Sequence, residues 1–576
     1  MDRFFPILEW LGNYKKGYFF SDLIAGLTVG IILIPQGMAY AMIAGLPPVY
    51  GLYASLLPVL MYVFLGTSRQ VAVGPVAMDS LLVAASLGTL AITGIENYIA
   101  MVIVLTFLVG AIQITLGLFK MGFLVNYLSR PVISGFTSAA ALIIIFTQLK
   151  HLLGVKIPGS SAFHELIMNA FVKIAETNLY DLLIGVLGIL IIILLKKVNK
   201  KIPSILVVVI LGIASVYYLN LEQFGVKLVG FVPSGLPSFQ MPGINMQLVS
   251  ELWPMALAIA MVGYLEAISI GKAMEEKAGE ETIEPNQELM ALGSSNIVGS
   301  FFQAYPITAS FSRSAINGDA GAKTNLAAFF SIIMVVATLL FLTPIFYYLP
   351  NAVLASIIMV SVFKLIDIGY AKQLWIHRKD EFFVLLITFL ATLSIGIKEG
   401  ILIGVLISLL LMVYRTSNPH FAVLGQIKGT DYFKNINRFE EDVVLQEDLL
   451  IVRFDAQLYF ANASYFKKEL FKHINAKGIA LKGVILNAEA INYIDSTAAN
   501  MLKKVILELQ EKGVRFYIAG AIGPTRDIIF SSGIIHLVQR ENLFVKTKAA
   551  VAYFNNPEIT EGLGVKIAHQ NKTYSN

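Results

Sequence analysis

The residues best suited to chemistry in this chain fall in one short stretch, Tyr305–Lys323. It contains Pro306, recurrent serine and threonine, a single Arg313 and closing glycines. A bilayer crossing takes about 20 apolar residues, and this stretch is too short and too polar for that, although long apolar runs flank it. A half-helix that begins inside the membrane fits the pattern best. Its free N–H groups and positive dipole end would face a buried anion.

A second stretch of the same kind lies in the first half of the chain. Residues 66–79 read GTSRQVAVGPVAMD, so that an extended apolar piece meets Gly74 and Pro75 before a helix begins. Short segments interrupted by Pro and Gly at matching places in two halves indicate an inverted repeat with a midplane site. We therefore predict that backbone N–H groups at Val76–Ala77 and Phe311–Ser312 form an anion cradle. The alternative is re-entrant packing without a ligand.

Side chains at the start of the second half-helix are candidates for direct anion contacts. The hydroxyl groups of Ser310 and Ser312 can donate to an anion, or to the preceding helical turn, as serines in membrane helices often do. Arg313 would add positive charge beside the anion. It would alternatively form a structural pair with a carboxylate such as Glu266, and both arrangements would explain a charge at this depth.

The first apolar span contributes two further candidates. Pro35-Gln36-Gly37 is expected to interrupt this span and to free backbone groups, which is tolerated beside a cavity or packed protein. Gln36 and Tyr40 would then line the pocket as an amide donor and an aromatic wall. Helix–helix hydrogen bonding or packing is an equally good interpretation of both side chains.

Two acidic residues are the candidates for ion coupling. Glu266 stands between Leu265 and Ala267 in an apolar span, where a carboxylate is costly unless it is paired or protonated. A carboxyl group that gains and loses a proton there would neutralise charge as a divalent anion enters. Asp79 lies one turn into the first half-helix. It would repel anions unless it is protonated, paired or turned away, and it would serve a cation or favour the helix N-terminus.

The elements that must position these residues are long apolar segments. The chain has 576 residues, of which 56% are hydrophobic and 14% charged, which is typical of a polytopic membrane protein. We expect fourteen segments, seven in each half, with the broken one third in each. They lie at about residues 23–43, 50–65, 74–91, 98–119, 132–149, 182–195, 205–219, 252–270, 289–302, 309–319, 326–348, 353–363, 382–395 and 400–414.

Basic residues orient these segments, since cytoplasmic loops carry an excess of Lys and Arg. Under this assignment most basic residues near the segment ends fall on one side, which places both termini in the cytoplasm. The residues on that side are Lys15, Lys16, Arg69, Lys120, Arg130, Lys196, Lys197, Lys200, Lys201, Lys272, Lys277, Lys323, Arg378, Lys379 and Arg415. A longer loop places Lys150, Lys156 and Lys173 on the other side.

The composition also argues against several classes of protein. The chain has no cysteine, its seven histidines show no metal-ligand spacing, and it has neither a P-loop nor a nucleophile–base set. The net charge of +5 is small and spread over loops. We therefore expect neither an enzyme nor a nucleic-acid-binding protein, and no catalytic residues, metal site or cofactor.

After about His420 the chain becomes an α/β unit in which short strands alternate with helices. Strands are predicted at 449–455, 483–487 and 514–519, and helices at 463–476, 496–512 and from 525. Ser496 follows Asp495 at a predicted helix start. Either residue is a normal N-cap, and a regulatory phosphorylation of Ser496 is the alternative.

Several motifs, in order along the chain, resemble one family of transporters. They are Ile34–Tyr40 (IPQGMAY), Ala44–Tyr53 (AGLPPVYGLY), 66–77, Pro285–Leu289 (PNQEL), and 310–324. Together they are similar to the sulfate permease (SulP) family of anion transporters, whose animal members include prestin. In the tail, Leu458–Ala463 (LYFANA), Ile494–Ala498 (IDSTA) and 513–520 resemble a STAS domain.

The resemblance implies a 7+7 inverted-repeat fold with core and gate domains, a homodimer and a cytoplasmic STAS domain. The expected division is an N-terminal cytoplasmic segment (1–20), a transport domain (21–415), a STAS domain (421–556) and a flexible tail (557–576). The resemblance also implies that Ser312 is an anion ligand. Bicarbonate-type relatives place an acid in the helix of Glu266 for sodium, and a Glu here rather than an Asp favours a proton.

These features predict a secondary active transporter that couples uptake of sulfate, or a related divalent anion, to protons by an elevator-type mechanism. The alternatives are a sodium-coupled bicarbonate symporter and a channel-like or exchanger-like protein resembling prestin, against which Glu266 argues. Expected partners are the small anion, the coupling proton or sodium, the lipid bilayer, a second copy of the chain and a cytoplasmic partner of the STAS domain. The expected location is the plasma membrane, which in a bacterium is the inner membrane.

Overall fold

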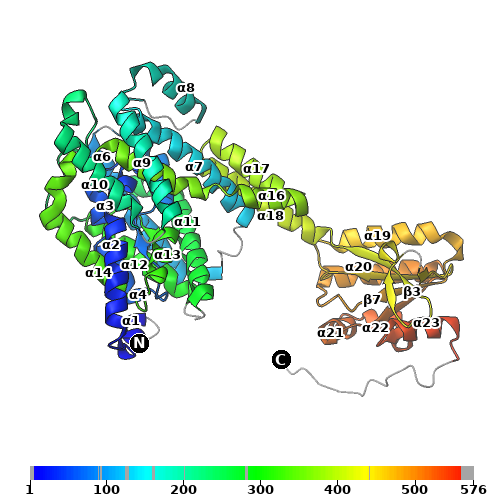
Figure 1. Cartoon of the computed structure of the whole chain (residues 1–576). Helices are drawn as coiled ribbons and strands as arrows, with labels where there is room; N and C mark the ends of the chain where they lie inside the picture. Colours follow the sequence, from blue (N-terminus) through cyan, green and yellow to red (C-terminus); the bar gives the residue numbers. More distant parts are fainter. Residues whose placement is uncertain are drawn as a thin grey trace. The chain divides into compact units, whose positions relative to one another are not determined.

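The computed structural model describes residues 5–88, 90, 92, 94–123, 129–157, 163–199, 202–278, 283–439 and 442–558. The side chains of 277, 278, 397 and 398 are outside this description. The chain divides into two compact units, Met1–Ser408 and Leu409–Asn576 (Figure 1). The tail predicted at 557–576 lies outside the described residues from 559 onward. Each unit is described below by itself.

The first half of the first unit is helical apart from one short strand. Its elements are α1 (Pro6–Gly12), α2 (Tyr18–Ile43), α3 (Val49–Tyr53), α4 (Leu57–Leu65), β1 (Val73–Gly74), α5 (Ala77–Gly88), α6 (Ile95–Leu118), α7 (Arg130–Leu152), α8 (Phe163–Lys173), α9 (Leu179–Val198) and α10 (Ser204–Leu219). A short broken element, β1 followed by α5, therefore stands among long helices, as the sequence predicts.

The second half repeats this pattern. Its elements are α11 (Met246–Ala278), α12 (Pro285–Phe301), β2 (Thr308–Ala309), α13 (Phe311–Asp319), α14 (Leu326–Ala337), α15 (Asn351–Val362), α16 (Ile368–His377), α17 (Lys379–Ser394) and α18 (Ile397–Ser417). A π-helical turn (Thr338–Leu342) and a 3₁₀ turn (Thr343–Tyr348) extend α14. Among the described residues, eight helices are long and apolar enough to cross a membrane.

Two predictions about the first two spans were wrong. The helix α2 runs without a break through Pro35, because proline is tolerated inside membrane helices that other helices surround. The second span, expected to be one helix, is divided into α3 and α4. Leu56, two residues before Pro58, leaves the helical region with φ −108° and ψ −97°. The interruption thus lies in the second span and not in the first.

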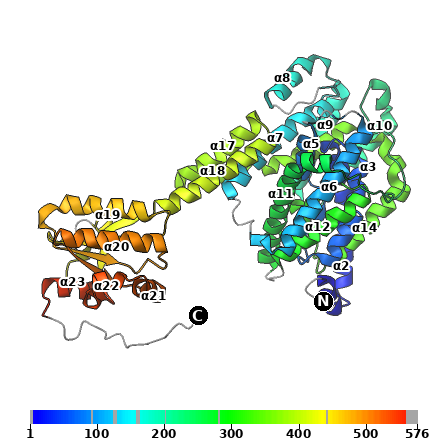
Figure 2. The ribbon, with the colours of Figure 1, turned by 180° about the vertical axis from the view of Figure 1, so that it is seen from behind.

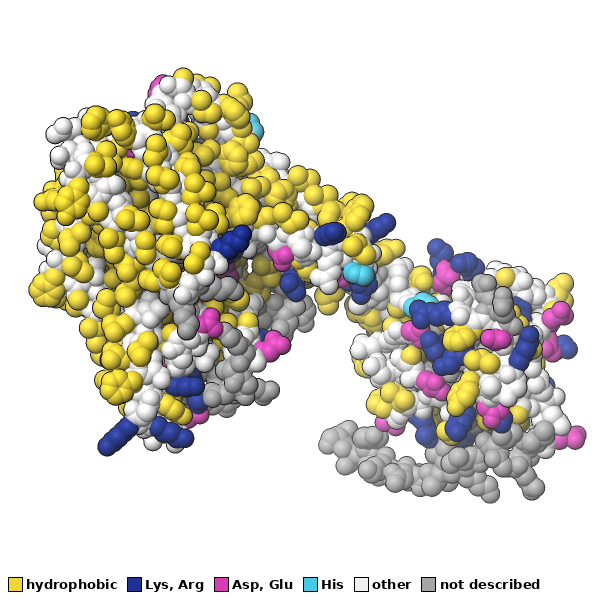
Figure 3. Space-filling view, in the orientation of Figure 1, with side chains coloured by type: hydrophobic (Ala, Val, Ile, Leu, Met, Phe, Trp, Pro, Cys, Tyr) yellow, Lys and Arg dark blue, Asp and Glu magenta, His cyan; other side chains and the backbone are white. Residues whose placement is uncertain are grey.

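Close backbone contacts hold the helices of this unit together. An added Cβ at Gly110 of α6 would lie 2.6 Å from the carbonyl oxygen of Gly293 in α12, and one at Gly293 would lie 2.7 Å from the carbonyl oxygen of Gly110. Such small residues let membrane helices approach closely. Figure 3 shows hydrophobic side chains over most of the visible surface of this unit, as expected of a surface in contact with lipid.

The second unit is a mixed sheet with helices on both faces. Its strands are β3 (Phe421–Ile427), β4 (Phe433–Asn435), β5 (Val443–Val444), β6 (Leu449–Phe454), β7 (Gly483–Asn487), β8 (Arg515–Ala519) and β9 (Leu543–Phe544). The order is β4-β3-β6-β7-β8-β9, with β5 paired to β3. Strands β6 to β9 are parallel, and β3 is antiparallel to β6.

Alternation along the central strands divides the core of the second unit into two layers. Val484 and Leu486 of β7 face the cluster that includes α19 (Ala463–Lys477) and α20 (Ser496–Glu511). Ile485 between them faces the cluster with α23 (Thr547–Asn555). Figure 2 shows α19 and α20 over one face of the sheet and α23 on the other. The remaining helices are α21 (Gly523–Ser531) and α22 (Ile534–Val538).

Candidate anion-binding site

The two broken segments meet in a two-residue antiparallel ladder in which Val73 pairs with Ala309 and Gly74 with Thr308. Helix α5 begins three residues after Gly74, and α13 begins two residues after Ala309. Both helices therefore start at the ladder, where their first N–H groups lack partners within the helix. The structure thereby brings together two positive helix ends, as the matching broken segments predict. Val76 and Ala77, at the start of α5, are both buried.

Bonds across the ladder tie one broken segment to the other. The N–H group of Ser310 donates to the carbonyl of Ala72 at 3.0 Å. The N–H group of Ala72 in turn donates to Oγ of Ser314 at 2.9 Å. The side chain of Asn317 adds a bond to the carbonyl of Gln70 at 3.0 Å. The segment that leads into α5 is therefore held by α13 itself.

Arg313 is a buried cation without a partner. Its side chain is 1% exposed, and none of its three guanidinium nitrogens has a hydrogen-bond partner within the described parts of the chain. The structural pair with Glu266, which the sequence left open, does not form. An added Cβ at Gly74 would lie 3.3 Å from Nη2 of Arg313. A buried unpaired charge is costly, so this guanidinium is the leading candidate for direct contact with an anion.

The two candidates on α2 reach the same place. This helix packs against both α5 and α13. Tyr40 is buried and, like Tyr305, lies close enough to the Arg313 guanidinium to interact with it electrostatically. Gln36 is 2% exposed, and its Oε1 has no hydrogen-bond partner in the described structure. Two phenol groups therefore lie near the free guanidinium, and the Gln36 amide lies one helical turn before Tyr40 on α2.

The first two residues of α13 are exposed, whereas Arg313, the third, is buried. Phe311 is 61% exposed and Ser312 is exposed as well, whereas Ser310 is buried. The two serine hydroxyl oxygens lie 3.5 Å apart. Ser310 occupies the N-cap position but makes no capping bond with its side chain. These hydroxyl groups are thus placed to donate to an anion at the open end of the helix.

The two acidic candidates lie close to each other on neighbouring helices. Asp79 is 1% exposed, and its Oδ1 has no hydrogen-bond partner in the described structure. An added Cβ at Gly263 would lie 3.2 Å from Oδ2 of Asp79. Gly263 stands one helical turn before Glu266 on α11, and the carboxyl groups of Asp79 and Glu266 interact electrostatically. Thr308 of β2 donates its hydroxyl to the carbonyl of Gly263 at 2.5 Å.

Sequence reasoning missed several polar residues that support this site. Tyr305 is fully buried beside Arg313, and its hydroxyl lies 3.4 Å from Oγ of Ser80. Asn296 and Gln113 form a buried amide pair at 3.0 Å. The signal that could have found them is simple: amide and phenol side chains inside apolar spans need partners, because lipid offers none.

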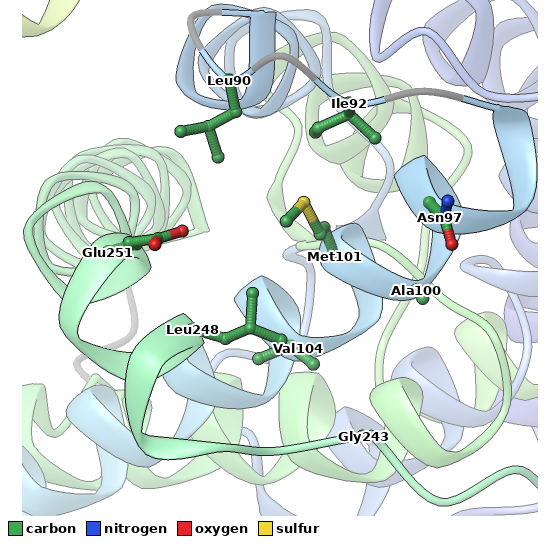
Figure 4. A pocket seen from close by; sticks show the side chains of 9 residues that line it. All are labelled: Leu90, Ile92, Asn97, Ala100, Met101, Val104, Gly243, Leu248 and Glu251. Carbon is green, nitrogen blue, oxygen red and sulfur yellow. The ribbon is translucent and has the colours of Figure 1, made fainter.

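A pocket of about 470 Å³ lies at a different place, between the ends of α5, α6 and α11. Its wall is mostly apolar, and Figure 4 shows the side chain of Glu251 pointing into it toward Met101. None of the residues predicted for the anion site lines it. Glu251 is fifteen residues from Glu266 on α11, which is about 22 Å along a helix axis. The pocket is therefore separate from the anion site.

In the second unit, Asp495 is the N-cap of α20. Its Oδ1 accepts from the N–H group of Ala498 at 2.8 Å, and its Oδ2 accepts from that of Phe460 at 2.9 Å. Ser496 is the exposed first residue of the helix. The capping role that the sequence left open between the two residues belongs to Asp495. Phosphorylation of Ser496 stays a prediction.

Comparison with known proteins shows the family of the chain. The sulfate permease family matches residues 19–388, and the STAS domain matches residues 440–550. The chain belongs to the sulfate permease family. It is therefore a multi-pass membrane protein of an anion transporter family, with a STAS domain near its C-terminus.

Three relatives show how far the similarity extends. Sulfate transporter 4.1, chloroplastic, of Arabidopsis thaliana is 38% identical over 574 residues, which cover 96% of this chain and 82% of that protein. Prestin of Danio rerio is 34% identical, with 89% of this chain and 74% of that protein covered. The structure of the murine solute carrier 26 family member A9 anion transporter in the inward-facing state has a TM-score of 0.87 at 27% identity, covering 96% and 94% of the two chains.

Proposed function

We propose that this protein is a secondary active transporter that takes up sulfate, or a related divalent anion, together with protons. The observation that carries the proposal is the unpaired guanidinium of Arg313 beside two helix N-termini. Fixed dipoles and one permanent charge stabilise a dehydrated anion without a mobile counter-charge. Ser310 and Ser312 supply hydroxyl donors, and α2 supplies Tyr40 beside the guanidinium and Gln36 one helical turn away from Tyr40. The sulfate transporters among the relatives support the choice of substrate.

The carboxyl groups of Asp79 and Glu266 supply the coupling. Two negative charges side by side in a buried, low-dielectric place repel each other strongly. A proton on the pair removes this repulsion and also lowers the negative charge that an arriving divalent anion would meet. Anion binding and proton binding therefore favour each other, and the coupling is reciprocal. Glu266 is the principal proton carrier in this proposal, and Asp79 assists it.

Transport would proceed by an elevator-type movement of one group of helices against another. Helices α2 and α11 pack with both half-helices, α5 and α13, while α6 packs with α5, α12 with α6 and α14 with α2. Helices α7, α9, α10, α15 and α17 pack mainly among themselves. The first group would carry the anion site as a rigid core, and the second would act as the gate. We further propose a homodimer in a plasma membrane, the inner membrane in a bacterium, with both termini in the cytoplasm and a STAS domain that binds a cytoplasmic partner.

The pair of acidic groups also supports a second candidate, sodium-coupled symport of bicarbonate. Carboxylate, carbonyl and hydroxyl oxygens are suitable ligands for a hard cation. Asp79 and Glu266, with the Gly263 carbonyl and the Thr308 hydroxyl nearby, provide all three kinds. In that case a cation would take the place of the proton between the two acids.

Uptake into proteoliposomes distinguishes these candidates. Radiolabelled sulfate and bicarbonate are offered under an inward proton gradient or an inward sodium gradient, with Glu266→Gln as the variant. Glu251→Gln, on the same helix but in the separate pocket, is the matched control. The proposal expects proton-driven sulfate uptake that Glu266→Gln abolishes and Glu251→Gln preserves. Sodium-driven bicarbonate uptake would establish the second candidate, and a lack of response to either gradient would refute both.

A further inference from the structure

One helix, α12, holds both broken segments through two buried polar side chains. The first is Glu288, which is 2% exposed. Its Oε1 accepts from the N–H and hydroxyl groups of Thr67, at 2.7 and 2.5 Å, and from the N–H group of Ser68 at 3.3 Å. Its Oε2 accepts from the hydroxyl of Tyr62 at 2.9 Å. This carboxylate thus holds the chain just before it enters β1 and α5.

The second side chain is Asn296, which is 1% exposed and lies eight residues further along α12. Its Oδ1 accepts from the N–H group of Ile307 at 2.9 Å. Its Nδ2 donates to the carbonyl of Ile307 at 3.3 Å and to Oε1 of Gln113 at 3.0 Å. Ile307 immediately precedes β2, so that Asn296 holds the chain just before it enters β2 and α13.

Gln113 carries this connection to the helix with the coupling acid. It is 1% exposed, and its Nε2 donates to the carbonyl of Ala260 in α11 at 3.2 Å. Ala260 lies less than two helical turns before Glu266. Asn296 of α12 is thus bonded to Ile307, which precedes β2 and α13, and to Gln113 of α6, and Gln113 is bonded in turn to α11. A fully satisfied buried network of this kind fixes geometry strongly.

We propose that Glu288 and Asn296 are positioning residues, which attach the two broken segments to α12 and so set the spacing of the two helix ends that hold the anion. This inference rests on the proposed anion site and adds to it the residues that hold it in register. The two-residue ladder and the bonds of Ala72, Ser314 and Asn317 tie the two broken segments to each other, whereas the bonds of Glu288 and Asn296 tie each segment to a long helix. The bonds to α12 fix each segment at its entrance.

Isosteric variants test the proposal, with transport kinetics as the first readout. Asn296→Asp keeps the size of the side chain but removes the amide that donates to Ile307 and Gln113. Glu288→Gln keeps the size of the side chain but replaces one acceptor oxygen with an N–H₂ group, which cannot accept the bonds that Tyr62, Thr67 and Ser68 donate. Each is expected to raise KM for sulfate about tenfold, because a displaced helix end stabilises the anion less. Turnover per folded transporter should change less than KM.

Ser295→Ala is the matched control on the same helix. The Ser295 hydroxyl is fully buried but has no hydrogen-bond partner in the described structure, so that its removal breaks no bond. It should leave KM unchanged. Thr67→Val serves as a milder variant if an isosteric one does not fold. It removes the hydroxyl donation to Glu288 and the weaker bond that this hydroxyl accepts from the N–H group of Glu284 at 3.3 Å, but keeps the N–H donation of Thr67 to Glu288. Its expected rise in KM is about threefold.

Amide hydrogen exchange of residues 71–80 and 305–314 gives a readout independent of transport. We expect faster exchange in both segments for Asn296→Asp and in 71–80 for Glu288→Gln. Values of KM within about twofold of the parent, with unchanged exchange, would overturn the proposal. A lower yield of folded protein at unchanged KM would also overturn it, since α12 would then only support the fold. If the parent takes up none of the offered anions, the proposed function fails and exchange alone decides this inference.

Discussion

The two half-helices that start at the β1–β2 ladder have the same backbone arrangement but opposite charges. Helix α13 places the cation Arg313 near its N-terminus, and α5 places the acid Asp79 at the corresponding end. Both side chains are 1% exposed, and the described structure gives no hydrogen-bond partner to the guanidinium or to Oδ1 of the acid. Under the proposed function, the half-helix with the cation serves the anion and the half-helix with the acid serves the coupling ion.

The largest expected effect comes from removing the cation. Arg313→Gln deletes the permanent charge beside the anion while keeping much of the side-chain volume. Loss of a charged hydrogen-bonding partner costs about 2–3 kcal/mol, which corresponds to a rise of about 30- to 150-fold in KM for sulfate. Uptake kinetics in proteoliposomes measure this rise in KM, and Arg313→Lys is the control that keeps the charge. A normal KM for Arg313→Gln would show that the helix ends alone bind the anion.

The acid on α5 should respond in the opposite direction. Asp79→Asn removes a negative charge near the anion, so that sulfate should bind at least as tightly as in the parent. Proton-driven accumulation should fall about tenfold, because the pair with Glu266 is lost. Binding and accumulation are measured separately on the same preparation. If Asp79→Asn lost sulfate binding as well as proton-driven accumulation, anion binding and proton coupling would not be divided between α13 and α5.

Two glycines allow each charge to be displaced without being removed. An added Cβ at Gly74, whose φ is +146°, would lie 3.3 Å from Nη2 of Arg313, and one at Gly263 would lie 3.2 Å from Oδ2 of Asp79. Gly74→Ala should raise KM for sulfate about tenfold through strain and crowding. Gly263→Ala should mainly reduce coupling. Equal effects of both variants on KM would remove the distinction between the halves.

A paired acid in the second unit gives the smallest effect and a reference for the unpaired ones. Asp455 lies 2.5 Å from Nε of Arg453 and 2.8 Å from Nδ1 of His420. Partial burial acts to raise the pKa of Asp455, but bonds and charges from these two neighbours outweigh it and lower the pKa. The pair therefore stabilises the fold above the unfolded pKa of about 3.9, and this contribution is lost as pH falls through the lower folded pKa.

Asp455→Asn should accordingly lower the stability of the second unit by about 0.5 kcal/mol at neutral pH, since a partly exposed pair is screened. The difference from the parent should vanish in acid. Hydrogen exchange of β3 and β6 in the full-length protein measures the loss of stability at neutral pH and its disappearance in acid. A difference that persists below the folded pKa would mean that packing, and not charge, accounts for the effect.

Much of the architecture follows from the sequence, because long apolar segments and breaks at Pro and Gly are local signals. The half-helix expected at about 309–319 is found at Phe311–Asp319, and the strand at Gly483–Asn487 and the family itself were predicted correctly. Pro35 was misjudged because neighbouring helices decide whether a proline breaks a membrane helix. The ladder between Val73 and Ala309 joins residues more than two hundred positions apart, and no local pattern encodes such a register.

The site followed from the sequence only as a set of candidates. Arg313, Ser310 and the half-helix ends could be named because they stand in a broken, polar stretch. Whether Arg313 is free or paired with Glu266 depends on how α11 packs against α13, which local residue types do not determine. The roles of Glu288 and Asn296 were missed for the same reason, since their partners come from segments distant in sequence or from backbone groups.

The most direct test of the account is the affinity for sulfate of the purified parent, measured by calorimetry at about pH 6 and about pH 8. Reciprocal coupling predicts tighter binding at the lower pH in the parent and a smaller dependence on pH in Glu266→Gln. An affinity that is the same at both pH values in the parent would contradict the account, because the anion and the proton would then bind independently.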